Sequence, residues 1–177
     1  FGRDTLVEQL LSLLEDQRFL TLIGGSGSGK SSVIMAGVLP RLREREHWRI
    51  LPVIVPGVHP LETLALLFAD AFNMAVSDVR KDLDNSDGRG LHLLADRLAR
   101  REQAERLILY VDQFEEAFTL TTSEDERRQF IDLLVKAVNE PRGTLTVIAT
   151  LRADFYDRPL NYPELGKLID AHSKSIL

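Results

Sequence analysis

A run of small residues that ends in a single lysine is the part of the chain best suited to chemistry. Residues 24–31 follow the spacing G-x-x-x-x-G-K-S. Glycines let the backbone bend closely around an anion, so that successive N–H groups point toward it. This spacing is the P-loop pattern, in which the lysine reaches the β- and γ-phosphates of a nucleotide and the next hydroxyl binds Mg²⁺. We expect phosphate contacts from Gly24, Gly25, Ser26, Gly27, Ser28, Gly29, Lys30, Ser31 and Ser32, with Lys30 also catalytic and Ser31 a metal ligand.

The segments on either side of this loop favour the same interpretation. Residues 19–23 form an apolar run typical of a strand, and residues 32–39 have the composition of a helix start. A flexible Gly/Ser linker would need neither a lysine at this step nor flanking elements of different periodicity. A helix that begins at the loop adds the positive end of its dipole, which favours phosphate. The pattern and its context together predict a nucleotide site.

An aspartate at the end of a second apolar run supplies the other half of such a site. Residues 106–111 read as a strand that is buried on both faces, and Asp112 follows directly. Ligands bind at the carboxyl edge of an open α/β sheet, where a buried carboxylate needs a cationic partner. Hydrated Mg²⁺ is that partner in P-loop proteins. We therefore expect Asp112, like Ser31, to hold the metal.

The residues after Asp112 predict how the site could activate water. Gln113 stands where a water-polarising glutamate is usual, and an amide cannot accept a proton. Glu115 and Glu116 follow it, and we expect one of them to be catalytic, with Glu115 favoured because it could swing back toward the γ-phosphate. The alternative is that both are first-turn acids favoured by a helix dipole.

An arginine follows another strand of the expected sheet. Arg152 comes directly after the apolar residues 144–150, at the edge where the nucleotide is expected. We expect it to sense the γ-phosphate and count it among the catalytic residues. The alternative is a surface ion pair with Asp154 or Asp157.

Strand and helix patterns alternate along the chain, which predicts an α/β fold with a parallel sheet. Pro52 favours an edge position for the second strand, and the P-loop helix is expected to end near Pro40. Residues 82–90 are polar and are expected to be flexible. A capping box, Ser123 to Glu126, opens the helix that precedes the fourth strand. The expected helices are 5–14, 32–40, 61–72, 91–104, 125–139 and 163–171; the expected strands are 19–23, 48–55, 106–112, 144–150 and 174–177.

Composition limits the classes of protein that fit. The 177 residues carry a net charge of −5, which argues against a broad nucleic-acid footprint, and the absence of cysteine excludes disulfides and thiolate zinc sites. We find no signal peptide and no apolar run long enough to cross a membrane, so we expect a cytoplasmic protein without a membrane partner. Both ends look cut, and we expect residues 1–177 to be one NTPase core from a longer multidomain protein.

Four strings of the sequence together resemble the STAND class of signalling P-loop NTPases. They are Phe1-Gly2-Arg3-Asp4, the P-loop, residues 111–118 and residues 150–157, with Pro56-Gly57 and Pro60-Leu61 in addition. The chain is most similar to the novel STAND group, often fused to WD40 repeats in bacteria. The resemblance covers nearly the whole chain, and the two strings after the P-loop, residues 111–118 and 150–157, are more specific than the P-loop itself.

The resemblance implies a three-layer fold with strand order 5-1-4-3-2, as in AAA-like ATPases. It implies that Gly2 and Arg3 line the adenine or ribose of ATP or ADP, and that Arg152 is a sensor. It further implies a Mg²⁺-dependent signalling switch, closed with ADP and assembling through self-association with ATP. The helical and winged-helix segments of the family would follow Leu177.

Three other classes of P-loop protein were weighed against this one. A small-molecule kinase would need an arginine-rich lid, and a GTPase would need Asn-Lys-x-Asp to read guanine; the sequence contains neither. The absence of Asn-Lys-x-Asp therefore favours adenine over guanine as the base of the nucleotide. An AAA-like ATPase acting on nucleic acid stays an alternative, although the acidic charge and the lack of a basic-aromatic stripe argue against it.

Overall fold

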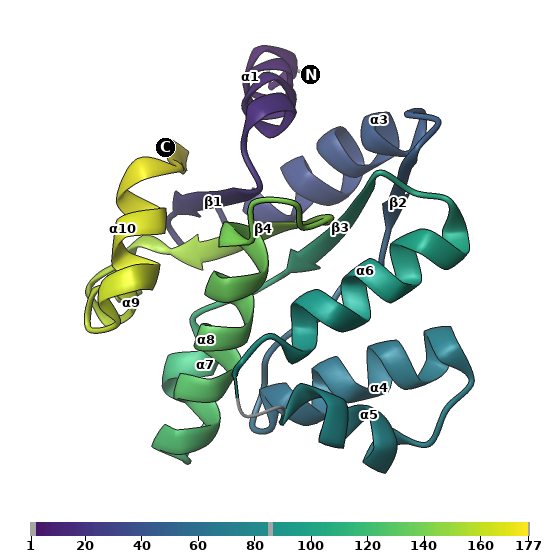
Figure 1. The fold of residues 1–177 in the computed structure, drawn as a ribbon. Coiled ribbons are helices and arrows are strands. Elements are labelled where there is room, and N and C mark those ends of the chain that lie inside the picture. The colour runs from purple at the N-terminus through teal and green to yellow at the C-terminus, as the bar shows by residue number, and fades with distance from the viewer. Residues whose placement is uncertain (1–2, 85–86, 177) are drawn as a thin grey trace.

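The computed structural model describes residues 3–84 and 87–176, and these form a five-stranded parallel sheet between helices (Figure 1). The strand order β2-β3-β4-β1-β5 is the expected order 5-1-4-3-2 read from the other edge. Every residue of β1 is buried, as are the last five of β3, because helices cover both faces of the sheet. The strands are β1 Phe19–Gly24, β2 Trp48–Ile50, β3 Arg106–Val111, β4 Leu145–Arg152 and β5 Ser173–Ile176.

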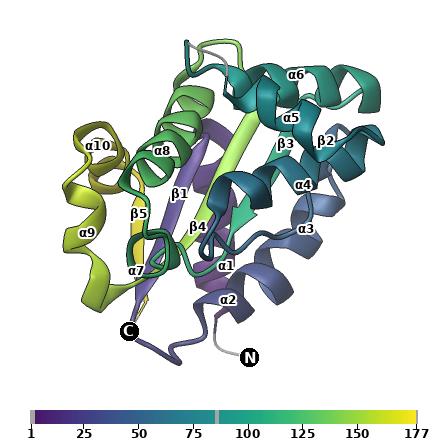
Figure 2. The same ribbon diagram turned by 90° about the horizontal axis from the view of Figure 1, so that it is seen from below.

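The helices make two layers, one on each face of the sheet (Figures 1 and 2). One apolar core joins the sheet to α1 and to the long helix after the P-loop, and a larger core lies under α4, α5, α6, α8 and α10. The three layers predicted from the sequence are therefore present. The helices are α1 Asp4–Asp16, α2 Lys30–Ser32, the π-helix η1 Val33–Val38, α3 Leu39–Arg43, α4 Pro60–Phe72, α5 Val76–Leu83, α6 Gly90–Glu102, α7 Glu116–Thr119, α8 Glu124–Asn139, the 3₁₀ turn η2 Ala153–Phe155, α9 Asp157–Leu160 and α10 Pro163–Ala171.

The P-loop helix does not end near Pro40, as the sequence pattern predicts, but continues to Arg43. A π turn explains how it passes the proline. The Leu39 N–H donates to the carbonyl of Ile34, five residues back, and Pro40 has no N–H to place in the next step. The helix therefore continues through a residue that normally stops one.

Two other boundaries differ from the sequence prediction. Strand β2 covers only three residues, and Ile54 makes a single further bridge to Val111, because Pro52 interrupts the ladder. Its edge position is confirmed. Helix α5 was not predicted, and it takes in the first residues of the segment expected to be flexible, of which 85–86 lie outside the described residues.

The capping box is confirmed in part, since the Ser123 hydroxyl accepts the Glu126 N–H at 3.2 Å. Strand β5 begins at Ser173, one residue before the expected start, and pairs with β1. Among the residues that the structure describes, no helix is long and apolar enough to cross a membrane.

Candidate nucleotide site

The P-loop lies at the carboxyl end of β1 and leads into α2. Gly27 and Gly29 have φ values of +72° and +83°, a conformation that side-chain-bearing residues rarely adopt, so the glycines are needed for the turn. The Lys30 ammonium donates to the carbonyl oxygens of Gly24 and Gly25 at 2.9 and 2.8 Å. Burial lowers the pKa of Lys30, and the nearby Glu115 carboxylate opposes that shift. The lysine is thus held inside the loop, at the place where a phosphate chain would lie.

The P-loop and the end of β3 meet at Ser31 and Asp112. The Ser31 hydroxyl donates to Oδ1 of Asp112 at 2.7 Å, across 81 residues of sequence. Burial by itself would raise the pKa of Asp112, but hydrogen bonds from Thr150, Tyr110 and Ser31 outweigh it, so the pKa is lowered. Asp112 therefore stays ionised beside the serine, and the two residues predicted as metal ligands lie in contact.

This pair fits a hydrated Mg²⁺. The ion prefers oxygen ligands and usually takes one or two protein groups, several waters and the phosphates of its substrate. A hydroxyl and an ionised carboxylate meet that requirement. Within residues 3–84 and 87–176, no group of three or more His, Asp or Glu side chains could hold a metal by itself, so a cage made only of protein ligands is not present there.

A cavity of about 220 Å³ opens at this edge of the sheet, and we call it the edge cavity. Its walls come from the P-loop and from the ends of β3 and β4. They are Ser26, Gly27, Lys30, Ser31, Gln113, Glu115, Thr150 and Arg152. Gln113 has a φ of +51°, and its N–H faces both Asp112 Oδ1 and Thr150 Oγ1 at 3.1 Å. The Gln113 N–H, on a strained backbone, therefore links the ends of β3 and β4.

Of the two glutamates predicted as catalytic, the structure brings only Glu115 into the edge cavity. Its side chain is 7% exposed, and its Oε2 accepts the Arg152 backbone N–H at 3.3 Å. Burial raises the pKa of Glu115, with the N–H of Arg152 and the charge of Lys30 acting in the opposite direction. Glu116 begins α7, half-buried, and does not line the cavity.

Arg152 meets both alternatives that the sequence leaves open, a place at the nucleotide site and a surface ion pair. It lines the edge cavity, and its guanidinium pairs with Asp154 at 3.1 and 2.6 Å while lying over the Phe155 ring. Asp157 is paired with Arg158 instead. Arg152 is half-buried and Asp154 is exposed, and an ion pair at the surface contributes little to stability.

A second cavity, of about 390 Å³, lies on the other side of the P-loop, and we call it the helix cavity. Arg3 stands at its mouth, and a Cβ built on Gly29 would lie 2.8 Å from the Arg3 guanidinium. Gly2, the other residue expected here, lies outside the described residues. Sequence reasoning named Arg3 and the loop but missed the rest of the wall, which is Val7, Val33, Ala36 and Gly37.

The wall of the helix cavity contains the π turn, a feature that is frequent at functional sites. A Cβ on Gly37 would lie 2.6 Å from Cγ2 of Val7, so only glycine lets α1 approach this closely. A glycine inside an otherwise apolar helical run was the one sequence signal that could have indicated this contact.

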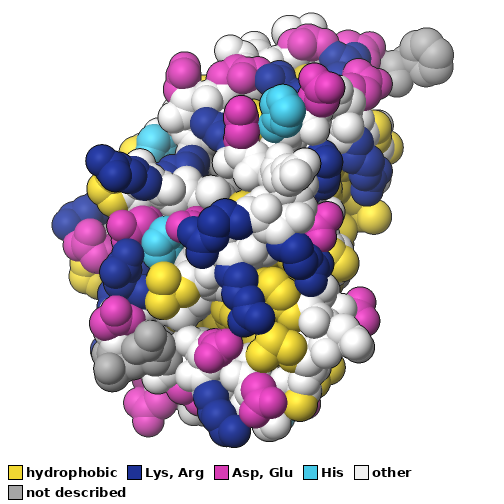
Figure 3. Space-filling model, turned by 45° about the vertical axis from the view of Figure 1, so that its right-hand side comes forward, with side chains coloured by type: hydrophobic (Ala, Val, Ile, Leu, Met, Phe, Trp, Pro, Cys, Tyr) yellow, Lys and Arg dark blue, Asp and Glu magenta, His cyan; other side chains and the backbone are white. Residues whose placement is uncertain are grey.

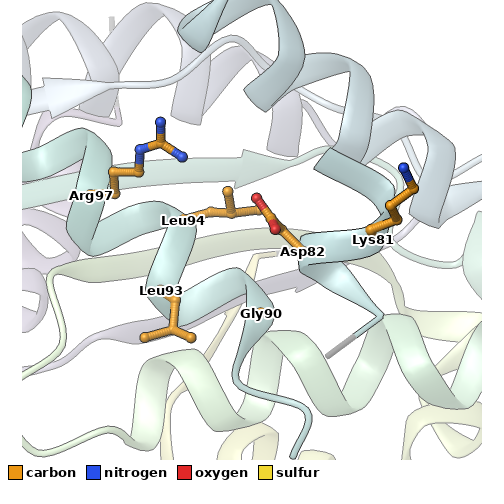
Figure 4. Close-up of a pocket in the computed structure, with 6 residues that line it drawn as sticks. All are labelled: Lys81, Asp82, Gly90, Leu93, Leu94 and Arg97. Carbon is orange, nitrogen blue, oxygen red and sulfur yellow. The ribbon is translucent and has the colours of Figure 1, made fainter. Parts of the chain in front are cut away.

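A larger cavity, of about 440 Å³, lies away from the P-loop, between α5 and α6 (Figure 4). Two cationic side chains, Lys81 and Arg97, and one acid, Asp82, line it beside Leu93 and Leu94. Figure 3 likewise shows Lys and Arg side chains interspersed with acids and apolar patches. The mixed charges around the cavity between α5 and α6 do not favour a triphosphate. The two cavities beside the P-loop are therefore the candidate nucleotide site.

Comparison with known proteins gives the same type of site. Over residues 1–177 the chain matches the family model described as Novel STAND NTPase 1. No protein of curated function matches the sequence. Similar solved structures include the Cdc6p protein of Pyrobaculum aerophilum (TM-score 0.59, 14% identity) and the ORC2 protein of Aeropyrum pernix in ADPNP–ADP complexes (0.68, 13%). A Walker-type ATPase of Pyrococcus abyssi is also similar (0.59, 16%).

These likenesses concern the fold. Each comparison covers 99% of this chain but only 45%, 47% and 53% of the other, so the chain spans about half the length of these solved proteins. At such identities the comparisons show a shared fold, and they do not extend to partners or substrates.

Proposed function

The chain belongs to the Novel STAND NTPase 1 family, and we propose that it is a Mg²⁺-dependent ATP switch with slow hydrolysis. The observation that supports this most directly is the 2.7 Å hydrogen bond from Ser31 to Asp112. It joins the phosphate-binding loop to an ionised carboxylate at the carboxyl edge of the sheet, which is the arrangement that phosphoryl transfer requires.

In this proposal, each side chain of the edge cavity has one part. Lys30 exchanges its two carbonyl partners for β- and γ-phosphate oxygens, and the loop N–H groups bind the same chain of phosphates. Ser31 and Asp112 would hold Mg²⁺, which would supply positive charge to stabilise the phosphates. Glu115 orients water, since its buried carboxylate lies beside Lys30 and has a raised pKa, as a proton acceptor working near neutral pH needs. Arg152 releases Asp154 to contact the γ-phosphate.

We propose ATP rather than GTP as the nucleotide. The chain lacks the Asn-Lys-x-Asp string that reads guanine, and the helix cavity offers apolar and backbone surface instead of a carboxylate for the guanine edge. Arg3 at its mouth is suited to the ribose or the α-phosphate. Tighter binding of GTP than of ATP by calorimetry would contradict this choice.

The switch itself is proposed from family membership. ADP would favour a closed state and ATP a state that self-associates, with sensor and effector domains outside these 177 residues, in the cytoplasm. The exchange of Arg152 between Asp154 and the nucleotide provides an element with two arrangements, as a switch requires.

Two measurements, made one after the other, test the proposed function. Calorimetry with ATP, ADP and GTP, with and without Mg²⁺, measures binding and its metal dependence. Light scattering of a longer chain of the same protein, loaded with ADP or with a non-hydrolysable ATP analogue, then measures association. If both nucleotides bind but the mass of the assembly is the same with each, the NTPase assignment would stand and the proposed assembly switch would be wrong.

A further inference from the structure

One carboxylate oxygen just past the end of β3, beside the edge cavity, has more hydrogen-bond donors than a metal ligand needs. Oδ1 of Asp112 accepts from Ser31 at 2.7 Å, Tyr110 at 2.7 Å, Thr150 at 2.5 Å and the Gln113 N–H at 3.1 Å. Among the described residues no donor is bonded to Oδ2. All four bonds therefore hold the same end of the carboxylate and leave the other end free.

We propose that Tyr110 and Thr150 are positioning residues, whose hydroxyl groups fix Asp112 through Oδ1 so that Oδ2 faces the hydrated Mg²⁺. This inference rests on the proposed Mg²⁺–nucleotide site and adds two residues that the P-loop and strand-end patterns do not include. Outer partners of metal-binding groups orient them in this way and commonly determine metal affinity.

The four donors differ in what they can do when a cation is bound. The Ser31 oxygen would bind the ion through a lone pair, and its O–H can go on donating to Asp112. Tyr110, Thr150 and the Gln113 N–H have no part in binding the ion, so they hold Oδ1 with or without it. The carboxylate therefore keeps one orientation when the metal binds.

Tyr110 is well placed for this part because its ring cannot move. It is fully buried in the core between the sheet and the P-loop helix, beside Ile108 and Ile148. A buried tyrosine hydroxyl requires a partner, and here the partner is Asp112, two residues further along the chain and directly after the end of β3. Phenylalanine would fill the same space without the hydroxyl.

The chain contains a matched control for each substitution. Tyr156 also donates to an aspartate at 2.7 Å, but its partner is the surface residue Asp170, away from the P-loop. Thr146 lies four residues before Thr150 on β4, is fully buried, and its hydroxyl has no partner among the described residues. Tyr156→Phe and Thr146→Val therefore remove the same groups without touching Asp112.

The experiment is a Mg²⁺ titration of the binding of a non-hydrolysable ATP analogue, measured by calorimetry for each variant. We expect Tyr110→Phe and Thr150→Val each to raise the half-saturating Mg²⁺ concentration about 10-fold. Binding of the analogue without Mg²⁺ should stay within about twofold of wild type, because Lys30 and the loop are unchanged. Both control variants should match wild type in both measurements.

The outcomes separate the proposal from the function on which it rests. If wild-type binding does not depend on Mg²⁺, the proposed function fails. If wild type depends on Mg²⁺ but Tyr110→Phe and Thr150→Val titrate as wild type does, the hydroxyl groups only satisfy their own burial and the positioning role is wrong. Equal losses with and without Mg²⁺ would indicate general damage to the loop and would also overturn it.

Discussion

The two cavities that flank the P-loop share Gly27 but are built in different ways. The edge cavity is made of strand ends, and its polar groups are already bonded to one another: Lys30 to loop carbonyls, Asp112 to three hydroxyls, Glu115 to a backbone N–H. The helix cavity is made of two helix surfaces and one arginine, and its shape depends on the contact between Val7 and Gly37.

This difference separates two tasks. Charges and dipoles that are fixed in advance suit the phosphates and the cation, which every nucleoside triphosphate has in common. A surface of apolar side chains and glycine suits the nucleoside, which differs from one nucleotide to another, and helix packing can adjust it. We expect substitutions in the edge cavity to change phosphate binding, metal dependence or turnover, and those in the helix cavity to change nucleotide affinity alone.

The largest effect is expected from Lys30→Ala, which should abolish nucleotide binding. With ADP at about 100-fold over its Kd, wild type should gain about 2.7 kcal/mol of unfolding free energy and the variant none. Thermal or chemical unfolding with and without ADP measures this. Lys167→Ala, a surface lysine paired with Glu164, is the control. An equal gain in the Lys30 variant would contradict phosphate binding by the edge cavity.

Glu115→Gln should come next, with turnover lowered by a factor of about 10² to 10⁴ and ATP affinity nearly unchanged. The amide keeps the size of the side chain but cannot accept a proton. Single-turnover hydrolysis separates the chemical step from binding. Glu116→Gln, outside the cavity, should have little effect. Equal losses of turnover in the two variants would contradict a catalytic role for Glu115 alone.

Gly37→Ala tests the helix cavity by itself. The added methyl group should push Val7 and α1 away, at a cost of about 1–3 kcal/mol for overpacking, partly offset by the better helix propensity of alanine. We expect ATP affinity to fall about 10-fold, with the half-saturating Mg²⁺ concentration unchanged. Adding Val7→Ala should restore affinity, because it makes room for the methyl group. A double-mutant cycle without coupling would contradict this contact.

The smallest effect concerns pH and the stability of the edge cavity. Burial raises the pKa of Glu115 above its ordinary value of 4.5. The folded chain then holds this proton more tightly than the unfolded chain, so the free energy of unfolding falls as pH rises from 4.5 through the folded pKa. Glu115→Gln removes this loss, so its stability relative to wild type should increase as pH rises above 4.5. Urea unfolding across this range, with Glu116→Gln as control, measures the difference; a constant difference would show that Glu115 is not strained by burial.

The edge cavity could be predicted largely from the sequence, and the helix cavity could not. Loop glycines, Lys30 and an acid after an apolar strand are tied to chemistry by residue type and spacing, and parallel strands bring their carboxyl ends to one edge. Strand order came from the family resemblance. Val7 and Ala36 are ordinary core-type residues, and only the packing of two helices brings them beside the loop.

Dependence on tertiary structure also explains why the sequence did not predict the end of the P-loop helix or the role of Tyr110. The pattern around Pro40 predicts a helix end because proline lacks an N–H, and no local signal indicates that a π turn compensates. Tyr110 reads as one more apolar residue of β3. Its hydroxyl matters only because it donates to Oδ1 of Asp112, which also accepts from Thr150 and Ser31 of two other segments.

The π turn also has a consequence for chain length. Such a turn holds one residue more than an α-helix over the same rise, and the Leu39 N–H already reaches back to Ile34. Deleting the half-exposed Met35 would make that pair an ordinary i, i+4 step and leave Leu39 and Leu42 facing the core. Deletion of one residue should therefore be tolerated here, inside a helix, where a deletion usually rotates everything downstream.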